Sequence, residues 1–194
     1  MNPLSKHFAT MAYNNAWANH RLIMACASLS QYEFVAARAS FFPSIKATLN
    51  HNITVDWFYV DALEREIRGD EPNQDCYSFF KIEEPFDACA DLMREQLSVD
   101  KRLIEYCKLL RDETINNRVV IARPGRAQVD TRTRLLSHLF QHQIHHRGQV
   151  HAMLADTLVK PPQLDEFFCE SEAHLRADDF TEMGITEEIV WGVT

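Results

Sequence analysis

The chain has 194 residues, of which 46% are hydrophobic and 25% are charged, a balance typical of a globular protein. This length allows one core, so we treat residues 1–194 as a single domain. The formal net charge is −8 and the 20 lysines and arginines are scattered, whereas nucleic-acid binders carry a basic face. We therefore expect no nucleic-acid partner.

The sequence also argues against a membrane protein and a disulfide framework. No apolar run reaches membrane-spanning length, and polar residues occur throughout the first 22 positions. The five cysteines form no C-x-x-C pair, and their odd number fits neither paired disulfides nor a thiolate zinc site. We expect a cytoplasmic protein with free thiols and no membrane association.

Sparse glycine and proline, together with apolar residues at helical spacing, predict an all-α fold, a four-helix bundle. The second helix has Ser44 as a good N-cap and ends before Gly69, which suits a helix C-terminus. The four expected helices span residues 3–28, 44–68, 85–111 and 131–158.

Two further segments complete the expected fold. Residues 114–130 hold three consecutive β-branched residues followed by Pro124 and Gly125, which predicts a short hairpin or an extended loop. The acidic tail, residues 163–194, is expected to form one short helix over residues 164–177 that packs on the bundle.

Histidines are concentrated in the fourth helix, where five of the nine lie between His138 and His151. His138, His142 and His146 follow an H-x-x-x-H-x-x-x-H spacing, and residues four apart share one helix face. Helical rotation places His142 and His146 in the sector of the apolar residues. These two imidazoles are therefore expected to point into the core.

Buried imidazoles need a partner for each ring nitrogen, and a metal ion satisfies several of them together. His51, in the first half of the second helix, is the natural third ligand. We predict that His51, His142 and His146 hold one divalent transition metal, which is zinc, nickel or iron. Because the ligands must be neutral, metal loss is expected on acidification between about pH 7 and 5.

Other polar residues near the predicted ligands are candidates for supporting roles. Asn52 and Asp56 fit two roles equally well, either orienting an imidazole through its second nitrogen or marking the edge of the core. Gln149 returns to the sector of His142 and is a candidate hydrogen-bond partner for a ligand. His7, His20 and His174 lie in polar company and are expected to be solvated.

The stretch from His138 to Gln149, HLFQHQIHHRGQ, resembles the signature of the DinB/YfiT-like family of predicted metalloenzymes. Residues 13–21 and 40–51 are similar to the family's helix-one motif and to the segment that ends on its first ligand position. Residues 161–165 match the region after its last long helix. The resemblance implies an up-down-down-up bundle, a homodimer and a triad at His51, His142 and His146, with His138 outside the ligand set.

Relatives in the wider superfamily include thiol-dependent transferases and isomerases. The resemblance therefore implies a metal-dependent enzyme acting on a small-molecule substrate, with a low-molecular-weight thiol as co-substrate. The sequence offers no Ser-His-Asp or Cys-His arrangement, so the metal would carry the chemistry, with Asp56 or His138 assisting proton transfer.

Three alternatives remain open at this point. Water in the open position would make the protein a metal-dependent hydrolase. A fourth protein ligand would make it a non-catalytic metal-binding stress-response protein. A helical interaction protein would satisfy its histidines by one another and by water. Beyond the family resemblance, the sequence supports a homodimer only through two aromatic side chains that are expected to be exposed, Trp17 and Trp57.

Overall fold

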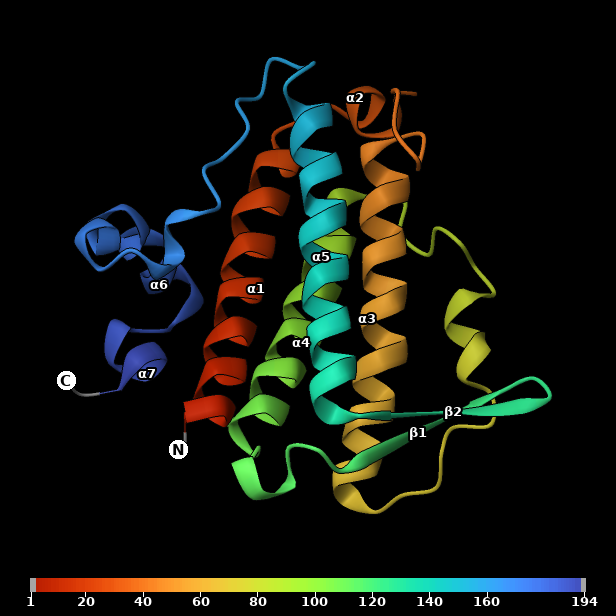
Figure 1. Ribbon diagram of the computed structural model, residues 1–194. Helices are drawn as coiled ribbons and strands as arrows, with labels where there is room; N and C mark the ends of the chain where they lie inside the picture. The colour runs from red at the N-terminus through yellow and green to blue at the C-terminus, as the bar shows by residue number, and fades with distance from the viewer. Residues whose placement is uncertain (1–2, 193–194) are drawn as a thin grey trace.

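Four long helices lie side by side in the computed structural model, which describes residues 3–192 (Figure 1). They contain the apolar residues whose spacing predicted them, and their apolar faces meet in a shared core. The expected all-α fold is confirmed. The long helices are α1 (Pro3–Ala27), α3 (Ile45–Arg68), α4 (Cys89–Lys108) and α5 (Arg132–Leu154).

Contacts between the helices establish their directions. Arg132 at the start of α5 bonds Glu66 near the end of α3, so these two helices are antiparallel. The backbone of Ser5, at the start of α1, donates to Asp112, just after the end of α4. Figure 1 shows the same arrangement, with α1 and α5 running one way and α3 and α4 the other. Along the chain the directions are therefore up, down, down and up.

The ends of α3 follow from local chemistry. The Ser44 side chain accepts a hydrogen bond from the backbone of Ala47, and Gly69 takes the left-handed conformation with φ of 75°. Two short elements were not predicted from the sequence. These are α2 (Gln31–Val35), capped by Ser30, and a 3₁₀ helix, η1 (Cys76–Phe80).

The segment between α4 and α5 forms a hairpin, which was one of the two predicted alternatives. After a 3₁₀ turn, η2 (Asp112–Thr114), strands β1 (Arg118–Arg123) and β2 (Arg126–Thr131) pair antiparallel. Gly125 in the turn has φ of 72°, a conformation that suits glycine. Val119 and Ile121 point into the main core, so one face of the hairpin covers the bundle.

The prediction of a single helix over residues 164–177 was wrong. This region forms two 3₁₀ helices, η3 (Glu166–Phe168) and η4 (Glu170–Arg176), followed by α6 (Ala177–Met183) and α7 (Glu187–Trp191). The buried guanidinium of Arg176 accounts for the difference. It donates to the backbone carbonyls of Glu166 and Cys169, so the chain wraps around the side chain.

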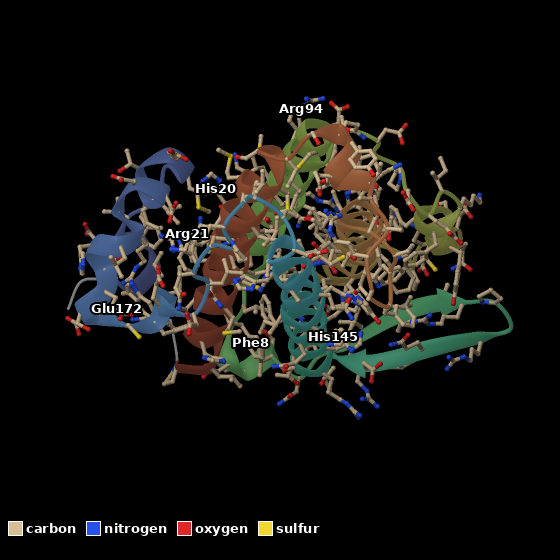
Figure 2. All side chains as sticks on the ribbon, turned by 90° about the horizontal axis from the view of Figure 1, so that it is seen from above. Phe8, His20, Arg21, Arg94, His145 and Glu172 are labelled. Atoms are coloured by element: carbon tan, nitrogen blue, oxygen red, sulfur yellow. The ribbon has the colours of Figure 1, made fainter. Side chains whose placement is uncertain are left out.

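These C-terminal segments pack on α1, on the opposite side of the bundle from the hairpin (Figures 1 and 2). Arg21 of α1 reaches into them and bonds Glu166 and Asp179. Trp17 is fully buried beneath them and donates to Asp179, so the expectation that it is exposed was wrong. Trp57 is half-buried. Neither ring is therefore the exposed aromatic expected at a dimer interface, because Trp17 is covered and Trp57 is partly covered.

His20 was expected to be solvated, but it is only partly exposed, and its Nε2 lies 3.2 Å from Oε2 of Glu182. His7 and His174 are exposed, as expected. No helix within residues 3–192 is both long enough and apolar enough to cross a membrane.

A layer of polar side chains lies buried in the centre of the bundle. Arg147 is central to it, and its Nη1 donates to the side-chain oxygens of Asn15 and Asn19. Both asparagines donate in turn to Asp100. All four long helices contribute to this polar layer, which consists of Asn15, Asn19, Asp56, Gln96, Asp100, Gln143 and Arg147.

Burial shifts the ionisation of the charged members of the polar layer. It raises the pKa of Asp100 to about 7 and that of Asp56 to about 6, while hydrogen bonds from Gln96 to both carboxylates oppose the rise. Burial lowers the pKa of Arg147 to about 10, and the two carboxylates oppose that change. Arg147 is thus the cation that offsets two buried carboxylates.

We expect Arg147→Met to lower the free energy of unfolding by about 3–5 kcal/mol, because it leaves buried carboxylates without their cation. Urea unfolding followed by circular dichroism measures this change. Arg94→Met is the matched control, since Arg94 pairs with Asp91 at the surface and should cost less than about 1 kcal/mol. Equal losses in the two variants would refute the role given to Arg147.

Candidate metal centre

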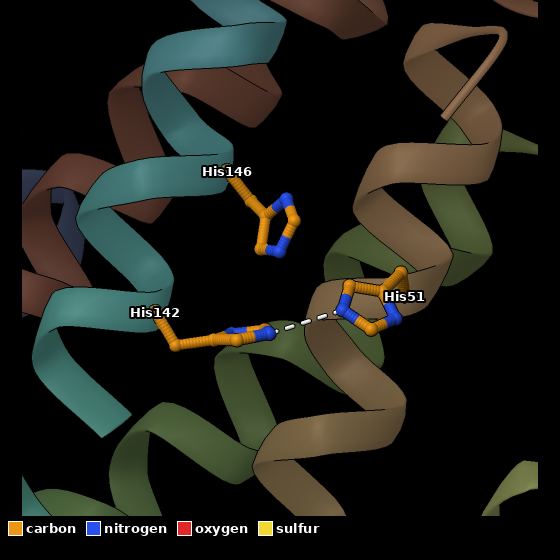
Figure 3. Close-up of side chains that lie close together, drawn as sticks. All are labelled: His51, His142 and His146. Carbon is orange, nitrogen blue, oxygen red and sulfur yellow. Dashed lines mark hydrogen bonds between the residues drawn. The ribbon is translucent and has the colours of Figure 1, made fainter. Parts of the chain in front are cut away.

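Three histidines converge where α3 and α5 lie against each other (Figure 3). His51 comes from the first half of α3, whereas His142 and His146 are one turn apart in α5. Because the two helices are antiparallel neighbours, His51 lies level with both. One ligand nitrogen from each ring lies within 4.8 Å of the others, and Nε2 of His51 is 3.0 Å from Nε2 of His142. Nitrogens that share one ion stand roughly 3–4 Å apart for bonds of about 2 Å.

The three imidazoles are neutral at neutral pH because they are withdrawn from water and face one another. His146 is buried, while His51 and His142 are half-buried. Burial, together with a smaller contribution from the neighbouring histidines, lowers the pKa of His51 to about 4 and that of His142 to about 3. Burial also lowers the pKa of His146, while the hydrogen bond that its Nδ1 donates to Oε1 of Gln149 opposes the change. Neutral imidazole is the form that binds a metal.

The hydrogen bond between His51 and His142 tests whether the site suits a metal. Only one hydrogen can lie between the two facing Nε2 atoms, so one ring donates and the other accepts. On the far side of its ring, Nδ1 of His142 is buried without a partner. A cation between the Nε2 atoms would accept a lone pair from each, which a shared hydrogen cannot do. The donor set therefore fits a divalent transition metal.

Phe42 covers one side of the triad. Its ring stacks on His51 with centroids 4.3 Å apart and lies 5.5 Å from the ring of His146. Arg38 holds this loop, because its backbone donates to the carbonyl of Pro43 and its guanidinium donates to the carbonyl of Glu33. Phe42 was not predicted from the sequence, although it lies in the segment that resembles the family's first ligand motif.

The chain also matches a known family over most of its length. A model of the DinB family matches residues 3–179. The chain belongs to the DinB family. No curated protein matches the chain. For this DinB-family protein, the cluster formed by His51, His142 and His146 is compatible with metal binding.

His138, a candidate for proton transfer, lies just outside the triad of this DinB-family protein. It is exposed, and its ring centroid is 6.1 Å from that of His142 and 5.3 Å from that of Tyr59. It lines a small cavity of about 220 Å³ together with Asp130 and Arg134. His138 is thus near enough to contact a ligand bound beside the triad, but it is not in the cluster.

Asp56, the other candidate for proton transfer, belongs to the polar layer. It is buried, and its carboxylate accepts hydrogen bonds from Gln96 and Gln143. Within residues 3–192 it makes no hydrogen bond to a histidine. Asn52 is also buried, and its Oδ1 has no partner. The residue that does bond a triad member is Gln149, whose Oε1 lies 2.8 Å from Nδ1 of His146.

The lowered pKa values predict an acid-sensitive fold in the metal-free protein. An unfolded histidine titrates near pH 6.5, so between about pH 6.5 and 4 these histidines bind more protons in the unfolded chain than in the folded one. The contribution of His51 and His142 to the free energy of unfolding should therefore fall as the pH drops through this window. The same lowered pKa values mean that protons compete with the metal for the histidines only at lower pH. We therefore expect metal to be lost near or below about pH 5, the lower end of the range of about pH 7 to 5 expected from the sequence.

Comparing histidine variants separates the contribution of His142 from that of the buried aspartates. Their raised pKa values make the folded chain, not the unfolded one, bind more protons at those positions. His142→Gln should show a shallower fall in urea midpoint between pH 6.5 and 4 than the unmodified protein. His7→Gln changes an exposed histidine and should leave the profile unchanged. Identical profiles for all three proteins would contradict the predicted pKa shift at His142.

Proposed function

We propose that this DinB-family protein is a metal-dependent enzyme whose divalent transition metal is held by His51, His142 and His146. The observation that carries the proposal is the convergence of three neutral imidazoles from two helices, with a ligand atom of each within 4.8 Å of the others. Zinc, nickel and iron all suit such a donor set.

An enzymatic role is favoured over a structural one by the number of ligands. Structural zinc sites are normally closed by four protein ligands, whereas catalytic sites keep one position open. Within residues 3–192, no fourth histidine, cysteine or carboxylate joins the cluster. His138, the nearest candidate on α5, is exposed and one turn away from His142. A bound metal would supply a Lewis acid that favours the deprotonated form of a thiol or of water.

The nucleophile is proposed to come from outside the chain. Burial raises the pKa of Cys89 to about 11 and raises those of Cys26 and Cys107 further. Burial also raises the pKa of Cys76, and a hydrogen bond with Glu172 raises that of the exposed Cys169, so none of the five thiols is poised as a thiolate. We propose a low-molecular-weight thiol as that nucleophile, which makes the protein an S-transferase. Water in its place would make it a hydrolase.

The chain's own residues would position and shield the reacting groups. Phe42 keeps one side of the triad apolar. His138, which lies one turn before His142 on α5, offers an ionisable group on the side away from His146. We further propose that the protein is a homodimer, supported by family resemblance alone, and that it works in the cytoplasm, where its thiols would stay reduced.

Purified protein should retain roughly one first-row divalent metal per chain after saturation and desalting, as measured by elemental analysis. His142→Ala and His146→Ala should each abolish retention, because two imidazoles no longer hold the ion. His174→Ala changes an exposed histidine and should leave the stoichiometry unchanged. Unchanged metal content in either triad variant would show that the assigned ligands are wrong.

A conjugation assay tests the proposed chemistry. The metal-loaded protein is mixed with an aromatic or alkyl electrophile, and with glutathione, bacillithiol and mycothiol in turn. We expect thiol-dependent turnover with at least one thiol, and its loss in His142→Ala. Stoichiometric metal without turnover across this panel would reject the transferase and favour the hydrolase or the non-catalytic alternative.

A further inference from the structure

Gln149 connects a triad histidine to an exposed one. It lies in α5, three residues after His146 and four after His145. Its Oε1 is 2.8 Å from Nδ1 of His146, and its Nε2 is 3.2 Å from Nε2 of His145. His146 is buried, Gln149 is half-buried, and His145 lies at the surface of α5 (Figure 2). The amide thus lies between two imidazoles in a single chain of hydrogen bonds.

The chemistry of an amide limits the hydrogen positions in this chain. An amide oxygen only accepts, so Nδ1 of His146 must carry a hydrogen. In a neutral imidazole the other nitrogen then has a free lone pair. For His146 this is Nε2, the atom that remains to face His51 and His142.

The nitrogen end of the Gln149 amide faces His145. The amide nitrogen only donates, and Nε2 of His145 accepts from it. Exchanging the two ends of the amide would place its NH₂ group against Nδ1 of His146. That nitrogen would then have to accept, and the hydrogen of His146 would move to Nε2. A ring with a hydrogen on Nε2 cannot coordinate through that atom.

We infer that Gln149 is a positioning residue that holds His146 in the tautomer with hydrogen on Nδ1. The consequence for metal affinity rests on the proposed function, whereas the tautomer is a property of the metal-free protein. His142 provides a contrast, because its Nδ1 is buried and has no partner. Of these two ligands on α5, only His146 therefore has a hydrogen-bond partner at Nδ1.

The first measurement is the tautomer of His146 in metal-free, ¹⁵N-labelled protein at neutral pH, obtained from long-range ¹H–¹⁵N correlation spectra. We expect hydrogen on Nδ1 in the unmodified protein and in Gln149→Glu, which keeps the acceptor. Gln149→Leu removes the acceptor and should shift the population toward hydrogen on Nε2. Gln141→Leu makes the same change at an exposed position of α5 and should have no effect.

The second measurement is metal affinity by competition with a chromophoric chelator, using Zn²⁺. Gln149→Leu should weaken binding by about 10–100-fold, as is typical when the partner of a metal-bound histidine is removed. Gln149→Glu should restore the affinity, and thermal melting of each variant checks that it is folded. A folded Gln149→Leu that binds Zn²⁺ as tightly as Gln141→Leu would overturn the inference.

The two measurements separate this inference from the proposed function. Hydrogen on Nε2 of His146 in the unmodified metal-free protein would overturn the inference even if Zn²⁺ binds. Hydrogen on Nδ1 in a protein that binds no metal would overturn the proposed function and leave the role of Gln149 in the tautomer supported.

Discussion

The arrangement of the four long helices depends on the buried guanidinium of Arg147. It extends from α5 to Asn15 and Asn19 of α1, which in turn bond Asp100 of α4. Gln96 extends the polar layer to Asp56 of α3. A buried charge is tolerated only when its partners are correctly placed, so this layer penalises any sliding of one helix past another. Apolar packing alone specifies register less strictly.

This register has a direct consequence for the histidine triad. Gln143 and Arg147 face the polar layer, whereas His142 and His146 immediately precede them in sequence and face His51. The two sets of groups on α5 also differ in ionisation, because the polar layer contains charged groups while burial keeps the imidazoles neutral. A metal held by neutral ligands keeps its full positive charge, which is the property needed to stabilise an anionic nucleophile.

Residues outside the triad complete the environment of the site. The loop before α3, held by Arg38, places Phe42 on His51, and Gln149 bonds the second nitrogen of His146. The orienting partner of a triad histidine is thus an amide on the same helix. Asp56 is instead committed to the polar layer, where its carboxylate offsets Arg147 and accepts bonds from two amides.

The sequence by itself determined the long helices and the pairing of His142 with His146 on one helix face, and it limited residues 114–130 to a hairpin or an extended loop, because each depends on local spacing, capping or turn chemistry. His51 was expected beside the pair, but its contact with His142 spans 91 residues and was established only by the tertiary structure. Ser44 and Gly69 mark the ends of α3 through bonds made within a few residues. Only the tertiary structure decided the course of the C-terminal segments, the burial of Trp17 and the place of Phe42. The chain wraps around the guanidinium of Arg176, and the covering segment comes from more than 140 residues after Trp17. Such contacts between distant residues leave no periodic pattern in the sequence.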